Sequence, residues 1–329
     1  MTDVLELLKQ ADPVDGAELR SEPPPCEVLE AILERPSRRP TRTRRRILVP
    51  AAGLALAAAI AIAVMIGGGA RPDEAAAAAL RHAADAAREQ PAAARLTPGE
   101  FLYTRVDAVP LLAMGPERPF HREIHSASDY GFSVQMPQTT ETWQGSASGL
   151  VRATVTGPRF PSARDRRAWI EAGRPRLPQS GTFEDGIGGG IERLSLPTDP
   201  GELLDELRHD AADGDHGNAY IFETLIADYL REPGATPEQR AALYEVAARL
   251  PGIELLGPRT DRDGRRGTAF ASDDDEGRHR VTLIIDPHTG NLLARRSVAL
   301  AGNPIPAGTV VEDSTFSAPA VVSGVGRRP

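Results

Sequence analysis

The chain has 329 residues, of which 46 are acidic and 38 are lysine or arginine, so its formal net charge at pH 7 is -8. An acidic chain lacks the basic face that phosphate binding requires, which excludes nucleic acid as an expected partner. The single cysteine, Cys26, excludes a disulfide within the chain, so packing must stabilise the fold.

Residues 1–46 combine an acidic stretch with a basic one. Residues 1–34 hold nine carboxylates against Lys9 and Arg20, and they contain two short apolar clusters with helical spacing. Because such short helices are unstable alone, the segment is either a disordered leader or a docking element that folds on a cytoplasmic protein partner. An anti-sigma factor has this layout, but a zinc-binding version is excluded because Cys26 lacks a second cysteine and a neighbouring histidine.

Residues 47–69 form an apolar run without a charged side chain. The run is long enough to cross a hydrocarbon layer of roughly 30 Å, which predicts one transmembrane helix. The arginines before it predict a cytoplasmic N-terminus and an exported C-terminal part at the plasma membrane. A cleaved signal peptide is one alternative, but about forty residues precede the run and no small-x-small cleavage pattern ends it. A buried core helix is the other, but it rarely has an arginine cluster at one end only. The membrane-orienting arginines are Arg38, Arg39, Arg42, Arg44, Arg45 and Arg46.

The exported part is predicted to begin with an alanine-rich helix between Pro72 and Pro91. Alternating polar and apolar residues predict strands next, and the last segment holds two strands joined by a hairpin around residues 146–149. Residues 157–193 are rich in proline, glycine and arginine and are predicted as a loop with one short helix. The predicted strands cover residues 99–109, 130–136 and 139–157.

Amphipathic helices follow, and strands fill the rest of the chain. Helices are predicted over 218–232 and 236–250, and within 194–211 after an extended entry and a cap at Thr198 or Asp199. A turn at 286–290 predicts a hairpin among the later strands. The predicted fold class is α+β, with one transmembrane helix followed by an exported domain that has a mostly antiparallel sheet and several packed helices. The expected divisions are a cytoplasmic leader (1–46), the transmembrane helix (47–69), an exported helix and linker (70–98) and an exported α+β domain (99–329).

Four motifs in the exported part are specific in combination: LPTDPxxLLxxLR, RAALYxxxAxLPGIELLG, DxDGRRGTAFA and IIDPHTGNLLA. Together they resemble an uncharacterised actinobacterial family of single-pass membrane proteins with an arginine-rich leader and one exported domain. The resemblance implies this topology, but it does not indicate an activity. The strand–DPxTG–strand unit is also similar to LolA/RseB-type domains, which implies a curved antiparallel sheet that binds lipid or lipoprotein tails.

Two segments contain residue types that bind metals, but neither has the spacing of a known site. In residues 121–125 the glutamate is in the wrong place for a HExxH motif, and residues 209–218 lack the glutamate that completes an EF-hand loop. Solvated polar segments are the simpler interpretation, so neither a metal nor another cofactor is expected. The weak metal candidates are His121, Glu123, His125, Asp213, Asp215 and His216.

Three functions fit these observations. The first is a membrane-anchored extracytoplasmic binding or sensory domain whose residues 1–34 contact a cytoplasmic protein, in the manner of a zinc-free anti-sigma factor. The alternative is a tethered module that binds a lipid or envelope component without signalling. The third, a metal-dependent hydrolase, has little support, and no enzyme activity is expected because Ala147 occupies the serine position of the only GxSxG-like segment.

Overall fold

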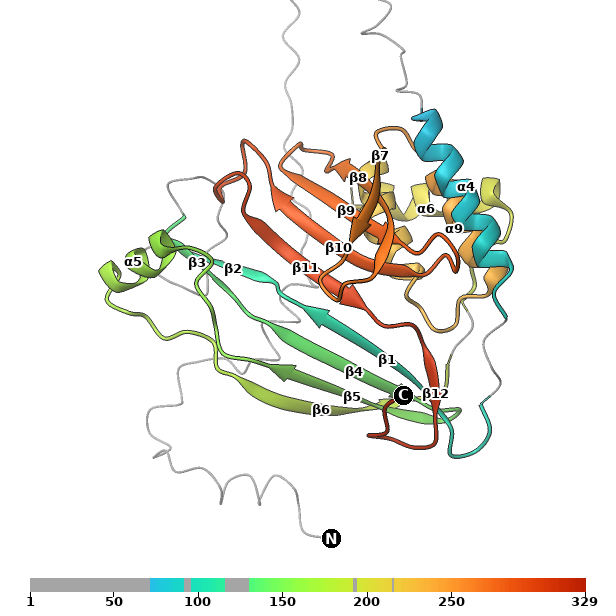
Figure 1. Cartoon of the computed structure of the whole chain (residues 1–329), viewed down its shortest axis with the longest axis horizontal. Coiled ribbons are helices and arrows are strands. Elements are labelled where there is room, and N and C mark those ends of the chain that lie inside the picture. Colours follow the sequence, from blue (N-terminus) through green and yellow to red (C-terminus); the bar gives the residue numbers. More distant parts are fainter. Residues whose placement is uncertain (1–71, 92–95, 116–129, 192–193, 215) are drawn as a thin grey trace, which may run out of the picture. The chain divides into compact units, whose positions relative to one another are not determined.

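The computed structural model describes residues 72–91, 96–115, 130–191, 194–214 and 216–329 (Figure 1). Its main feature is a ten-stranded antiparallel sheet with the strand order β6-β5-β4-β1-β11-β10-β9-β8-β7, and β12 also pairs with β1. The strands of this sheet are β1 (Phe101–Ala108), β4 (Gln138–Gln144), β5 (Ser148–Val155), β6 (Gly181–Gly188), β7 (Glu254–Thr260), β8 (Arg266–Asp273), β9 (His279–Ile285), β10 (Leu292–Ala299), β11 (Val310–Phe316) and β12 (Ala320–Val322).

Strand β1 joins the two halves of the sheet. One edge of β1 pairs along its length with β4, in a register that places Thr104 opposite Thr142. Its other edge is shared by two strands, because β11 pairs with the end of β1 and β12 pairs with its beginning. The three residues between β11 and β12 therefore face the middle of β1 and interrupt the sheet there.

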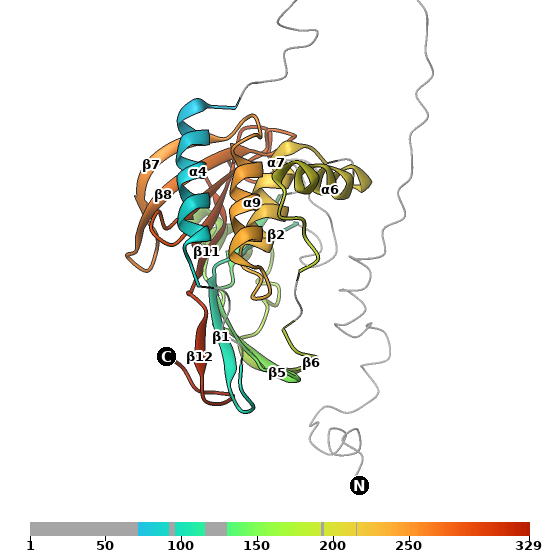
Figure 2. The same cartoon turned by 90° about the vertical axis from the view of Figure 1, so that its right-hand side faces the viewer.

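Helices cover one face of the later strands, whereas β4, β5 and β6 extend beyond this helix layer (Figures 1 and 2). Side chains cap the helix starts: Asp73 accepts from the N–H of Ala76 at 2.7 Å, and Thr236 forms a reciprocal capping box with Gln239. The helices of this layer are α4 (Glu74–Arg88), α6 (Pro200–Asp213), α7 (Asn218–Tyr220), the π-helix η2 (Ile221–Ile226), α8 (Ala227–Tyr229) and α9 (Pro237–Ala247).

The largest apolar cluster lies between this helix layer and the sheet. It contains the apolar faces of α4, α6, η2 and α9, together with side chains of β8, β9, β10 and β11. Helices α4 and α9 are direct neighbours, and the ring of Tyr244 in α9 is fully buried. Removal of this apolar surface from water is the main stabilising contribution to the fold.

A smaller unit consists of β2 (Leu111–Met114), β3 (Phe132–Gln135) and α5 (Ala163–Glu171). The carboxylate of Asp165 connects them, because it accepts from the hydroxyl of Tyr130 at 2.6 Å and from the N–H of Ser133 at 2.9 Å. Burial raises the pKa of Tyr130 to about 12, so its hydroxyl remains a donor at neutral pH. This network holds α5 on the short β2–β3 sheet.

The predicted fold class requires a correction, because the structure does not show the transmembrane helix that it contained. Among the described residues, no helix is both long enough and apolar enough to cross a membrane. The longest of them, α4, has 15 residues, whereas a span needs about 20, and it carries Arg81 and Asp85. Residues 47–69, on which the prediction depended, lie outside the described residues. The corrected fold class is a large antiparallel sheet with helices on one face.

Most individual elements of the described residues agree with the sequence patterns. The predicted helices at 194–211 and 236–250 are confirmed as α6 and α9, and the hairpin at 286–290 joins β9 and β10. For residues 157–193 the predicted short helix is confirmed as α5, whereas the prediction that the rest is loop is wrong, because β6 lies there and forms one edge of the sheet. Strand β6 has three glycines and two acids, so its strand conformation depends on pairing with β5 instead of an apolar pattern.

Candidate ligand-binding cavity

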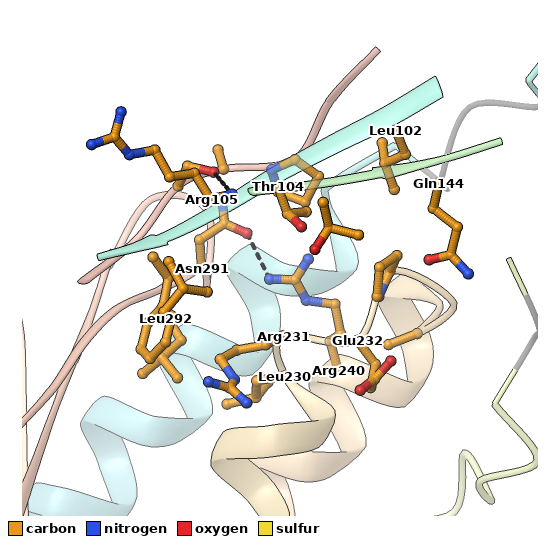
Figure 3. A pocket seen from close by; sticks show the side chains of 18 of the residues that line it. Leu102, Thr104, Arg105, Gln144, Leu230, Arg231, Glu232, Arg240, Asn291 and Leu292 are labelled. Atoms are coloured by element: carbon orange, nitrogen blue, oxygen red, sulfur yellow. Dashed lines mark hydrogen bonds between the residues drawn. The ribbon is translucent and has the colours of Figure 1, made fainter. Parts of the chain in front are cut away.

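A cavity of about 760 Å³ lies between β1 and the ends of the helices. Its sheet side comes from β1, β4, β5, β6 and the β11–β12 connection. Its helix side comes from residues 90–91 after α4, residues 230–235 and the start of α9 (Figure 3). Cavities of this volume accommodate small-molecule ligands in other proteins. This makes the cavity the leading candidate for a binding site.

Strand alternation provides the floor of the cavity. Side chains of a strand point alternately to opposite faces, and Leu102, Thr104 and Val106 of β1 all line the cavity. Tyr103, between two of them, points to the other face, where it packs against Trp143 with ring centroids 5.4 Å apart. The floor is therefore partly apolar, with a threonine hydroxyl at its centre.

A break in the sheet forms part of the wall. The hydroxyl of Ser317 accepts a hydrogen bond of 2.8 Å from the N–H of Arg105, and the N–H of Ser317 donates to the carbonyl of Arg105 at 2.9 Å. Pro319 has no N–H to contribute to the ladder. The serine hydroxyl thus provides a hydrogen-bond acceptor for the backbone N–H of β1 where the partner strand is interrupted. The connection between β11 and β12 lines the cavity at this point.

Residues after α8 form an apolar wall with a cation over it. Leu230 is buried, and the guanidinium of Arg231 lies 4.9 Å from the centre of the Phe316 ring. Arg231 also pairs with Asp228 at 2.9 Å, so its charge already has an acidic partner. A cation in this position over a ring contributes of order 1 kcal/mol and holds the wall against β11.

Arg240 enters the cavity from the first turns of α9 and points toward β1 (Figure 3). Its Nη2 donates to Oδ1 of Asn291 at 2.6 Å and to the carbonyl of Gly290 at 3.3 Å. The Nε of Arg240 is buried and has no hydrogen-bond partner within the described residues. Tyr244 donates to the same Gly290 carbonyl at 2.6 Å, and complete burial raises its pKa, so it remains a neutral donor.

Among its described lining residues, the cavity has fewer acidic side chains than basic ones. Glu232 is the one carboxylate among the described lining residues, and it is exposed, so water and salt screen its charge. The described lining contains no histidine and no cysteine. The arrangement provides apolar walls, a few hydroxyl and amide groups and one inward-pointing cation, which are the elements of a binding site.

The metal candidates of the sequence are only partly described. His121, Glu123, His125 and Asp215 lie outside the described residues, as do the membrane-orienting arginines 38–46. Asp213 ends α6, and the ring of His216 stacks on Tyr220 with centroids 4.0 Å apart. Within the part of the chain that the structure describes, no group of three or more metal-binding side chains comes together.

A second, smaller hollow of about 280 Å³ lies beside the β8–β9 turn. His279 borders it, with Nδ1 at 3.1 Å from the carboxylate of Asp274 and Nε2 at 2.8 Å from the amide of Asn303. Both ring nitrogens therefore have partners that hold the turn together. Nearby, the carboxylate of Asp275 accepts from the N–H of Gly217 at 2.7 Å and caps the start of α7, a role that the sequence did not indicate.

The cavity residues come from distant parts of the chain, which is why sequence reasoning missed them. One signal was present: Arg240 precedes Leu243, Tyr244 and Ala247 at helical spacing, so it lies on the apolar face of the predicted helix. A lone cation on a buried helix face is unusual and marks a possible site. The sequence also showed that residues 102, 104 and 106 share one face of a strand, but it did not show that this face borders a cavity.

Two comparisons with known proteins found no relatives. No family model matches this chain, and no curated protein matches it. The resemblance to the actinobacterial membrane family and to LolA/RseB-type domains therefore stays a prediction from the motifs.

Proposed function

We propose that this domain is a binding module that holds a partly apolar small molecule, such as a lipid, in the cavity beneath β1. The observation that carries the proposal is the 760 Å³ cavity, whose walls alternate apolar side chains with a few hydroxyl, amide and guanidinium groups. Ligand sites combine these two elements because apolar contact provides affinity and a few polar groups fix orientation.

The position of the cavity in the fold supports this proposal. The buried core between α4, α9 and the later strands is closely packed, whereas the face of β4, β5 and β6 beyond the helices has no such cover in the described part. The cavity lies at this boundary, with Thr142 and Val151 on its sheet side. A ligand there would bury apolar surface that the helices leave exposed.

Two wider aspects of the function rest on the sequence alone. The arginine distribution before residue 47 supports a proposed placement of this module outside the plasma membrane. The helical spacing of residues 1–34 supports a proposed cytoplasmic protein partner for them. A pull-down with residues 1–34 as bait tests the second prediction, and recovery of nothing above background would remove it.

The binding proposal is tested with the purified full chain and a series of twelve-carbon amphiphiles below their micellar concentrations. A chain with Thr104→Trp fills the cavity floor and should bind them at least tenfold more weakly. The matched control is Thr154→Trp, because Thr154 lies on β5 with its side chain on the opposite face of the sheet. This control should bind like the unaltered chain.

The readouts are isothermal titration and mass spectrometry of co-purified small molecules. Equal binding by the Thr104→Trp and Thr154→Trp chains would place the site elsewhere. Absence of binding by any amphiphile to the unaltered chain, with none co-purified, would overturn the proposed function.

A further inference from the structure

Arg240 is the feature of the cavity that the fold explains least. An arginine side chain loses considerable conformational freedom when it is ordered, and its guanidinium loses hydration when it is enclosed. Proteins usually compensate for this cost with a carboxylate partner. Among the described residues Arg240 has only neutral partners, the carbonyl of Gly290 and the amide oxygen of Asn291.

The geometry also leaves donors of Arg240 for a ligand. Guanidinium has five N–H donors, and the two contacts above both use Nη2. Among the described residues, Nη1 makes no hydrogen bond and, unlike the unpartnered Nε, is not shielded from solvent, so it is the donor that faces a ligand. The neighbouring cation, Arg231, differs because it pairs with Asp228 and covers Phe316. Arg240 is thus the cation of this cavity that has charge and donors available.

Building on the proposed function, we infer that the ligand is an amphipathic anion whose carboxylate or phosphate pairs with Arg240 while its apolar part lies along β1 and Leu230. The remaining N–H donors of a guanidinium form charge-assisted hydrogen bonds with either group, so the inference covers both head groups. Leu102 and Val106 supply the apolar contacts on the sheet side. Asn291 holds the guanidinium in place, which reduces the entropy cost of binding.

The experiment compares three ligands with the same chain length: dodecanoate, dodecyl phosphate and neutral 1-dodecanol. Each is titrated into the purified full chain in the same buffer. At least one anion should bind about tenfold or more tightly than the alcohol, which corresponds to one charged hydrogen-bonded pair. The relative affinity of dodecanoate and dodecyl phosphate then identifies the preferred head group.

Two variants of Arg240 and one control connect this preference to the residue. Arg240→Gln should remove the preference for anions, while Arg240→Lys, which keeps the charge, should retain part of it. Arg249→Gln removes the same charge from an exposed position after α9 and should leave the preference unchanged. Thermal unfolding of each variant shows that it is folded.

The outcomes separate this inference from the proposed function. If 1-dodecanol binds as tightly as both anions, or if Arg240→Gln weakens all three ligands equally, the anion inference is wrong while the binding function stands. If none of the three ligands binds the unaltered chain, the proposed function itself fails. A preference for anions that survives Arg240→Gln would assign the head group to another residue and overturn the inference.

Discussion

The hydroxyl of Tyr103 donates a hydrogen bond of 2.8 Å to the buried carboxylate of Glu141, on the face of the sheet opposite the cavity. Arg328 binds the same carboxylate with two nitrogens, at 2.5 and 2.6 Å. The indole of Trp143 donates to the carbonyl of Arg327 at 2.6 Å. The residues after β12 are therefore held against β1 and β4, which keeps β12 in place beside the cavity.

The Glu141 carboxylate should make stability depend on acid pH. Hydrogen bonds from Arg328 lower the pKa of Glu141 below its ordinary value of 4.5. A lowered pKa contributes stability that is fully present above about pH 4.5 and is lost as the pH falls through the folded-state pKa. Urea unfolding between pH 3 and 7 should show this loss in the unaltered chain and a smaller one in Glu141→Gln. Parallel pH profiles for the two chains would contradict this role.

The helices and the later strands could be predicted because local signals and tertiary packing agree there. The helix that begins after Thr236 has a capping residue, a proline in its first turn and a regular apolar face, and all three are present in α9. The glycine at 290 likewise marks the turn between β9 and β10. In these segments each residue favours the structure that the whole fold requires.

Other features could not be predicted because they depend on distant contacts. The segment 218–232 has a helical pattern, but nothing in it shows that residues 221–226 adopt π-helical bonding. The cavity depends on the interruption of the sheet at Ser317, which only pairing with β1 creates. Arg240 and Asn291 are brought together by the packing of α9 against the β9–β10 turn, so their spacing in the sequence carries no signal.

Glu223 in η2 should destabilise the fold at neutral and alkaline pH. Burial raises its pKa to about 7, Asp273, Asp274 and Asp275 add to this effect, and Arg295 opposes it. Because the folded-state pKa lies above the ordinary 4.5, the cost is absent below about pH 4.5, grows up to about pH 7 and is constant above it. Glu223→Gln should therefore be more stable than the unaltered chain at pH 8, by about 3 kcal/mol.

The comparison needs a second glutamine variant to exclude a general effect of removing one negative charge. Glu238 is exposed on α9, so Glu238→Gln should change the free energy of unfolding by less than about 0.5 kcal/mol at either pH. The gain for Glu223→Gln should disappear at pH 4. A gain of equal size at pH 4 and pH 8 would show that it does not arise from ionisation of Glu223.

Arg265 should be a strong stabilising residue on the β7–β8 turn. It binds the buried carboxylate of Asp261 at 2.7 Å through Nε, and its other nitrogens donate to the carbonyls of Phe316 and Leu293. Arg265→Ala leaves Asp261 buried without its cation and should cost about 3 kcal/mol in the free energy of unfolding. Arg266→Ala, an exposed neighbour, should cost less than about 0.5 kcal/mol. Similar unfolding midpoints in urea for the two variants would refute the assignment.

Gly290 should be intolerant of a side chain for two separate reasons. Its φ is +63°, and a Cβ there would lie 2.9 Å from both the carbonyl oxygen of Ala83 and the Cβ of Ala87 in α4. Gly302 has a φ of +93° with open space around it, so Gly302→Ala should cost only the backbone strain, about 1 kcal/mol. Gly290→Ala should cost at least about 1 kcal/mol more, because α4 must also move.

The same substitution tests how the cavity is connected to the helix layer. The Gly290 carbonyl accepts from both Arg240 and Tyr244, so a shift of this turn away from α4 should displace the Arg240 guanidinium as well. Gly290→Ala should therefore weaken the binding of dodecanoate or dodecyl phosphate more than that of 1-dodecanol, whereas Gly302→Ala should affect none of them. Titration of both variants under conditions where each is folded measures the difference. An unchanged ratio of anion to alcohol affinity in Gly290→Ala would show that Arg240 keeps its position without this turn.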